Sequence, residues 1–258
     1  MIKLSELLHE GINDPGILKA VFLAGGPGSG KTYVAKGLFG IPERINVSQT
    51  GMKMVNSDKE LKFLLNKYGF GTDLDSLPDE VFQNLTGDGP DASGLRKFAK
   101  SLTKQRQKLY SEGRLGMIID GTGDDYNKIS AEKKELEEIG YDTFMIFVNT
   151  SLDVALQRNQ QRARVVPENI VKQSWEDVQK NMAFFQGLFG NANFLLVDNS
   201  KHLSPKQADA KFKMLINKGI DKFLKKPIKS KIGKAWLRRE KKHQKVFKDP
   251  GQSRFFER

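Results

Sequence analysis

Short apolar runs alternate with longer, more polar segments along most of the chain. The apolar runs have the length of buried strands and lie at residues 19–24, 52–56, 115–120, 143–148 and 194–197. The segments between them predict helices, which we expect at residues 31–39, 58–68, 78–85, 95–111, 127–139, 152–161 and 169–185. Strands that alternate with helices are typical of a parallel sheet covered on both faces. The expected fold class is therefore α/β, a three-layer sandwich around a five-stranded parallel sheet.

The ends of the chain and its composition narrow the class of protein. Residues 1–10 indicate a short amphipathic helix rather than a signal peptide, because they lack a long apolar core and a cleavage site. No apolar run approaches the roughly 20 residues that span a bilayer, so we expect a soluble protein without a membrane partner. The absence of cysteine excludes disulfides and thiolate metal sites and suits a reducing cytoplasm.

Charge is distributed unevenly between two parts of the chain. Residues 1–200 hold 24 Lys and Arg against 26 Asp and Glu, whereas residues 201–258 hold 19 against 5. We therefore expect a near-neutral domain at residues 1–200 and a basic, largely helical or irregular extension at residues 201–258. Clustered cations indicate binding to nucleic acid, since neutralised phosphates drive such binding. The alternatives are a solvated helix face or a tail that packs on the body.

One glycine-rich segment carries the strongest chemical signal. It satisfies the phosphate-loop pattern between the first expected strand and the first expected helix, which is the context the motif requires. The segment reads Gly25, Gly26, Pro27, Gly28, Ser29, Gly30, Lys31 and Thr32. Glycines let backbone N–H groups surround phosphates, Lys31 is expected to reach the β- and γ-phosphates, and the Thr32 hydroxyl to bind Mg²⁺. The sequence thus predicts binding of ATP and Mg²⁺.

Two other classes of nucleotide-binding protein fit the sequence less well than a kinase. A GTPase ordinarily carries an Asn-Lys-x-Asp motif, which the sequence lacks. A motor ATPase usually ends its third-strand region in Asp-Glu, but here Asp120 is followed by Gly121. Without that Glu, no residue is evident to activate water, and a kinase is favoured.

A kinase needs a base beside the acceptor hydroxyl, and Asp58 lies just beyond the second expected strand. A carboxylate there can accept the proton and orient the hydroxyl oxygen. The alternative is that Asp58 only caps the following helix, because Asn, Ser and Asp are good cap residues. The two roles are compatible.

Three arginines follow the helix expected at 152–161. Arg158 and Arg162 are four residues apart and share one helix face, and Arg164 follows them. Arginine side chains neutralise a transferred phosphate, so we expect Arg158 and Arg162 in catalysis and Arg164 at the nucleotide. The alternative is a solvated helix end that favours cations.

These motifs together resemble the small P-loop kinases that include polynucleotide 5′-hydroxyl kinases and zeta toxins. The likeness covers residues 18–200 and rests on the phosphate loop, the Asn-x-Asp that ends in Asp58, and the Arg-Asn-x-x-Arg stretch before Pro167. It implies a lid at about residues 158–168 and Arg162 as the lid arginine. It also implies Asp58 as general base, and Asp120 near the metal or the acceptor.

One departure from that family leaves the acceptor open. The polynucleotide kinase pattern places an acceptor-binding arginine three residues after the base, and this chain has Leu61 there. We expect transfer to a hydroxyl of a nucleic acid or nucleotide, either an end or a hydroxylated base. A kinase of a nucleotide sugar or another small hydroxyl compound, as in zeta toxins, is the first alternative. A P-loop ATPase or binding module without kinase activity is the second.

Overall fold

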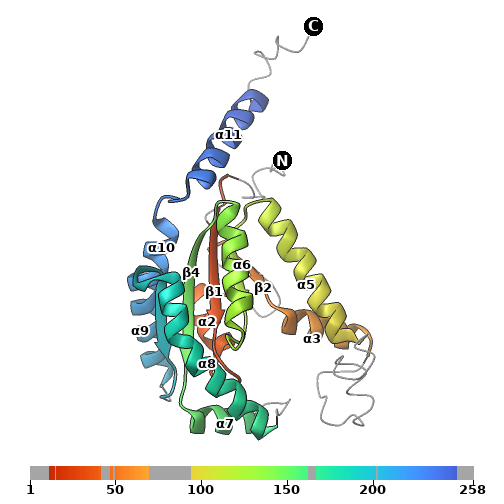
Figure 1. Cartoon of the computed structure of the whole chain (residues 1–258), viewed down its shortest axis with the longest axis vertical. Coiled ribbons are helices and arrows are strands. Elements are labelled where there is room, and N and C mark those ends of the chain that lie inside the picture. Colours follow the sequence, from red (N-terminus) through yellow and green to blue (C-terminus); the bar gives the residue numbers. More distant parts are fainter. Residues whose placement is uncertain are drawn as a thin grey trace.

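The computed structural model describes residues 12–14, 16–41, 47–48, 50–69, 94–161, 167–201 and 203–248. Its centre is one five-stranded sheet in the order β2-β3-β1-β4-β5 (Figure 1). The strands are β1 (Lys19–Ala24), β2 (Lys53–Val55), β3 (Met117–Asp120), β4 (Asp142–Asn149) and β5 (Phe194–Asp198). All four strand pairings are parallel, which confirms the predicted sheet.

The helices fall between the strands, as the alternating pattern predicts. Between β1 and β4 they are α2 (Lys31–Phe39), α3 (Ser57–Lys67), α5 (Leu95–Glu112) and α6 (Tyr126–Glu138). After β4 they are α7 (Leu152–Gln160), α8 (Glu168–Phe189), the 3-10 turn η1 (Asn191–Asn193), α9 (Pro205–Leu215), the π-helical turn η2 (Ile216–Ile220), α10 (Asp221–Lys225) and α11 (Lys231–Lys248). The helices expected at residues 1–10 and 78–85 lie outside the described residues.

One face of the sheet is covered by α2, α9 and α10. Their apolar side chains form a cluster with the alternate strand residues Val21, Leu23 and Ile146. Gly37 in α2 makes a close helix contact possible, because a methyl group there would lie 2.3 Å from the ring of Phe212 in α9. Two helices thus approach closely where one of them lacks a side chain.

The other face is covered by α6 and α8, which pack on strand residues such as Phe22 and Phe147. Helix α5 lies farther to one side and packs on α3 through a small cluster of its own, which contains Leu61, Leu64 and Ala99 (Figure 1). A cavity lies between α5 and α6 on this face of the sheet.

The central strand β1 lies between β3 and β4. Strands β2 and β3 lie on one side of it and strands β4 and β5 on the other, so the strand order reverses at β1. In open parallel sheets of this kind, ligands bind at the carboxyl ends of the strands where the order reverses. The phosphate-loop residues follow β1 at this point. The fold therefore places the predicted nucleotide site at the expected edge.

The basic region of residues 201–258 divides into two structural parts. Residues Phe212, Ile220 and Phe223 of α9, η2 and α10 are buried in the same cluster as α2. Helix α11 instead projects away from the body at the amino-terminal edge of the sheet, opposite α7 (Figure 1). No helix in the described part of the chain is long and apolar enough to cross a membrane.

Candidate active site

The phosphate loop, residues 25–32, joins β1 to α2 with a backbone that requires glycine. Gly28 has φ +75°, and a methyl group there would lie 2.4 Å from the carbonyl oxygen of Ala155 in α7. Gly30 precedes α2 with φ +82°. Left-handed conformations and close backbone approach both favour glycine. The loop is therefore shaped by its contact with α7 as well as by the needs of a phosphate.

Lys31 and Thr32 begin α2 at the end of this loop. The Lys31 ammonium is half-buried and hydrogen bonded to the carbonyl oxygen of Gly25, which holds it over its own loop. The Thr32 side chain is exposed in the first turn. Because a helix N-terminus carries partial positive charge, these two residues lie where an anionic phosphate is favoured.

Two carboxylates lie at the ends of the neighbouring strands β2 and β3. Asp120 ends β3, and Asp58 is the second residue of α3. Asn56 connects them: its Nδ2 donates to Asp120 Oδ2 at 2.7 Å, and its Oδ1 accepts from the backbone N–H of Asp58 at 2.7 Å. Asn56 is thus the cap of α3, and the exposed side chain of Asp58 does not perform that role.

The surroundings of Asp120 prepare it for a cation. Burial raises its pKa to about 6, with the Lys31 charge opposing that shift and the Asp58 charge adding to it. Oxygen Oδ1 of Asp120 is buried and has no hydrogen-bond partner in the described part of the chain. A hard oxygen ligand with an unused lone pair fits Mg²⁺, which typically takes one or two protein ligands plus phosphate oxygens.

Of the three predicted arginines, the structure describes one. Arg158 lies in the last turn of α7, and its Nη1 is 3.5 Å from the carbonyl oxygen of Gly28. It therefore reaches the phosphate loop, and its contact with a phosphate stays a prediction. Arg162 and Arg164 lie outside the described residues, as do all of residues 162–166 of the expected lid.

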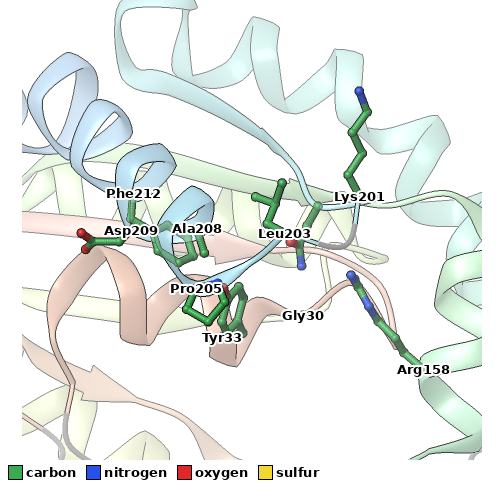
Figure 2. Close-up of a pocket in the computed structure, with 10 residues that line it drawn as sticks. Gly30, Tyr33, Arg158, Lys201, Leu203, Pro205, Ala208, Asp209 and Phe212 are labelled. Carbon is green, nitrogen blue, oxygen red and sulfur yellow. The ribbon is translucent and has the colours of Figure 1, made fainter.

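A cavity of about 650 Å³ adjoins the phosphate loop between α2 and α9. Figure 2 shows Arg158 reaching in from α7 beside Gly30, with Pro205 lying above Tyr33 on the opposite side. The rings of Tyr33 and Phe212 meet edge to face with centroids 5.3 Å apart. Apolar walls with a few polar groups are typical of a site for a flat organic group.

A second cavity, of about 970 Å³, lies on the other face of the sheet between α5 and α6. Its floor includes Ile119 and Asp120 of β3, and Ser57 of α3 lies at the same end. Lysines line the α5 side. The cavity thus has a candidate metal ligand, Asp120, at its floor, and Asp58 follows Ser57 directly in the chain.

A comparison with protein-family models matches residues 21–185 to the AAA domain family. The chain belongs to the AAA domain family. The match begins in β1 and ends in α8, so it contains the phosphate loop, both carboxylates and Arg158. It confirms the predicted AAA-type P-loop class, and the structure is a P-loop kinase-like fold.

Solved structures with a similar fold include the Pnkp1/Rnl/Hen1 RNA repair complex, with 17% identity and a TM-score of 0.44 over 66% of this chain and 46% of that one. A gluconokinase from Sinorhizobium meliloti 1021 has 16% identity and a TM-score of 0.41, with 79% and 95% covered. The PezAT toxin–antitoxin system of Streptococcus pneumoniae has 13% identity and a TM-score of 0.44, with 80% and 87% covered. A comparison with curated proteins found no match.

Sequence reasoning missed a residue that shapes this AAA domain. Asn199 follows β5, and its buried side chain donates to the carbonyl oxygen of Ser29 at 2.8 Å. It therefore fixes the phosphate loop from the far side of the sheet. The signal that could have found it is its position, since polar residues directly after parallel strands gather at one edge.

The structure also explains the departure at Leu61. Its side chain is buried between α3 and α5 in the cluster with Leu64 and Ala99. An arginine at this position would place a charge in an apolar cluster, which is costly. Position 61 therefore contributes to packing between α3 and α5.

Proposed function

We propose that this protein transfers the γ-phosphate of ATP to a hydroxyl group of a second substrate. One observation carries the proposal: the Asn56 side chain joins Asp120 to the start of α3, which holds Asp58, and Asp120 and Ser57 line a cavity of about 970 Å³. A nucleotide-binding protein without an acceptor needs no such cavity beside its carboxylates.

Each residue of the proposed donor site has a separate task. The loop N–H groups and Lys31 hold the β- and γ-phosphates, and the cavity beside Tyr33 holds the base and ribose of ATP. Thr32 and Asp120 are the residues that would hold Mg²⁺, which neutralises phosphate charge when bound. Arg158 and Arg162 add positive charge at the transferred group, and Arg164 contacts the nucleotide.

Asp58 is the proposed general base. It accepts the proton of the acceptor hydroxyl while that oxygen forms a bond to the γ-phosphorus. The bond between the γ-phosphorus and the β–γ bridging oxygen breaks, and ADP leaves with that oxygen. Since Asn56 already caps α3, the Asp58 carboxylate is available for this proton.

A nucleic acid or nucleotide is the acceptor that the charge distribution supports best. Helix α11 holds eight Lys and Arg against one Glu, and lysines line the acceptor cavity. A small hydroxyl compound is the second candidate, because cavities of about 300–1,000 Å³ are typical of small-molecule sites. An ATPase or binding module without transfer activity would leave this cavity without a role.

Transfer from γ-labelled ATP tests the proposal directly. The protein is incubated with separate panels of single-stranded RNA, single-stranded DNA, nucleosides and sugars, and the label is located. We expect label on one panel with wild type and none with Lys31→Ala. Label found as inorganic phosphate alone in every panel would show that the protein is an ATPase and would overturn the proposal.

A further inference from the structure

Three lysines of α5 form a row along the acceptor cavity. Lys100, Lys104 and Lys108 are spaced four residues apart, and all three line the cavity. Residues four apart share one helix face and lie about 6 Å apart along the axis. The α5 wall therefore presents positive charge at regular intervals.

The opposite wall, on α6, has a different character. Its lining includes Glu132 and Glu135 of α6, with Lys128 on the same helix, and Asp124 and Asp125 directly before the helix. Gln107 of α5 is hydrogen bonded to Glu132, so the two walls are joined and lie close together. The cavity is a narrow groove with one basic side and one mainly acidic side.

The groove runs from the catalytic edge of the sheet to the opposite edge. Ser57, Asp120 and Thr122 line one end, and Ser111 and Ile139 line the other. Helices α5 and α6 both run antiparallel to β1 (Figure 1), and β3 is parallel to β1, so the last turns of both helices lie near the start of β3. The groove thus follows the length of the sheet.

The far end of the groove meets the base of α11 on both sides. Beyond α5, the Arg114 guanidinium lies over the ring of Trp236 at 5.9 Å from its centroid. Beyond α6, the backbone at Gly140 packs against Gly233 so closely that a methyl group at Gly233 would lie 2.5 Å from the Gly140 carbonyl oxygen. Helix α11 then carries the basic surface away from the body (Figure 1).

We infer that the groove between α5 and α6, continued by α11, is a track for one strand of nucleic acid whose hydroxyl end reaches Asp58 and Asp120. This inference rests on the proposed transfer function and names its substrate class. The phosphates lie along the α5 lysines and α11. The bases face α6, where hydrogen bonds from base amino groups to the carboxylates replace the Gln107–Glu132 hydrogen bond that crosses the groove.

The two walls favour a nucleic acid over an acidic peptide. A peptide that pairs its carboxylates with the lysines brings no hydrogen-bond donors of comparable number toward the α6 carboxylates. A polynucleotide carries negative charge on one side and base N–H donors on the other. The α5 residues that line the groove run from Lys100 to Ser111, or about 18 Å, which corresponds to about five stacked nucleotides at roughly 3.4 Å each.

Binding of labelled oligonucleotides at several salt concentrations tests the track. The track variant is Lys100→Ala, Lys104→Ala and Lys108→Ala together. Each lost phosphate contact should reduce the log–log salt slope by about 0.7, so the slope should fall by about 2 in magnitude. Affinity for a 12-nucleotide strand at low salt should fall roughly 10- to 100-fold. Strands of RNA and DNA and a duplex are measured side by side.

A matched control removes three lysines from outside the groove. Lys134, Lys180 and Lys213 are exposed, and each is paired with an acidic neighbour on its own helix. Their combined change to alanine should leave affinity and salt slope near the wild-type values. A second variant, with Lys234, Arg238 and Lys242 of α11 changed to alanine, should weaken the binding of strands longer than about five nucleotides more than that of shorter ones.

Different failures point to different parts of the proposal. If phosphate transfer occurs but the track variant matches its control, the track is wrong and the transfer function stands. If no panel accepts phosphate, the transfer function is wrong, while the binding measurements still judge the track. If polyglutamate competes as well as single-stranded RNA or DNA, or the duplex binds best, the inferred substrate class is overturned.

Discussion

The two faces of the sheet each hold one cavity, and the two cavities are built differently. Beside α2 and α9, the nucleotide cavity is formed by backbone and ring contacts, such as Gly28 against α7 and Tyr33 against Phe212. Beside α5 and α6, the groove is lined by long charged side chains. The first construction fixes one shape, whereas the second provides charge that can follow a flexible partner.

This difference predicts that substitutions on the two faces of the sheet have different effects. Alterations on the donor side should disturb geometry and ATP handling, since little there can move without a clash. Alterations on the acceptor side should change proton transfer and charge, with ATP binding retained. Measurements of ATP binding and of phosphate transfer distinguish these two outcomes.

The largest expected effect comes from the groups closest to the chemistry. Asp58→Asn should reduce transfer by about 10²–10⁴-fold and leave the Kd for ATP near wild type, because it removes a general base. Lys31→Ala should weaken ATP binding as well, because it removes a phosphate contact. The measurements are kcat for transfer and Kd for ATP. Wild-type transfer by Asp58→Asn would exclude it as the base.

The next effect concerns Asp120, which lines the groove and is the proposed Mg²⁺ ligand. The pKa of Asp120 is raised above its unfolded value of 3.8 to about 6, so its stabilising effect is full below about pH 4 and is lost as the pH rises through 6. Asp120→Asn should therefore gain up to about 3 kcal/mol of unfolding free energy over wild type between pH 4 and 7. Urea unfolding without Mg²⁺ or nucleotide measures this difference.

Asp177 on α8 provides the opposite case for that measurement. Hydrogen bonds from Gln173 hold the pKa of its exposed carboxyl below the usual range, and Lys180 contributes. Its stabilising effect is present above the unfolded pKa and is lost as the pH falls. The gain of Asp120→Asn should therefore grow as pH rises, whereas Asp177→Asn should show a loss there. The same sign for both variants would contradict the assigned cause at Asp120.

A smaller effect is expected from the arginines at the donor side. Arg158→Lys and Arg162→Lys should each lower kcat about 10-fold or more, because an ammonium cannot reproduce a planar, two-pronged guanidinium contact. The loss should appear in kcat more than in KM, since the charge they stabilise peaks in the transition state. An unchanged kcat would mark either residue as a surface arginine.

The smallest effect concerns the close packing of α2 on α9, where we expect the usual effect of replacing a helical glycine to be reversed. Replacing glycine inside a helix with alanine normally stabilises it by about 0.5–1 kcal/mol. Gly37→Ala should instead destabilise the protein by about 1–2 kcal/mol, because the methyl group meets the Phe212 ring. Gly187→Ala in α8, which meets nothing within 4 Å, is the matched control and should stabilise. Thermal unfolding compares the two.

The sheet could be predicted because strands buried on both faces appear as continuous apolar runs. The phosphate loop could be predicted because its chemistry requires glycine and lysine at fixed spacing. Helix ends were less certain: α8 runs to Phe189, four residues beyond its expected end, and α3 is capped by Asn56 rather than Asp58. The catalytic roles of Asp58 and the arginines remain predictions.

Other features depend on how elements lie side by side, which no local pattern records. The sideways position of α5 creates the groove, but the sequence of α5 shows only an amphipathic helix. In α9 and α10 the many lysines obscured the apolar positions, although Phe212 and Phe223 belong to the core. The basic charge of this region could be read from the sequence, but the packing of α9 and α10 in the core could not.

The close contact between Gly140 and Gly233 sets the direction in which α11 leaves the body. The first turns of α11 pack on the body through Gly233 and Trp236, while its 18 residues extend about 27 Å. A tilt of about 10° at the foot would move the tip by about 5 Å, close to the distance between adjacent α5 lysines in the row. A single added methyl group at Gly140 or Gly233 would therefore re-aim the basic helix without touching any residue at the catalytic edge.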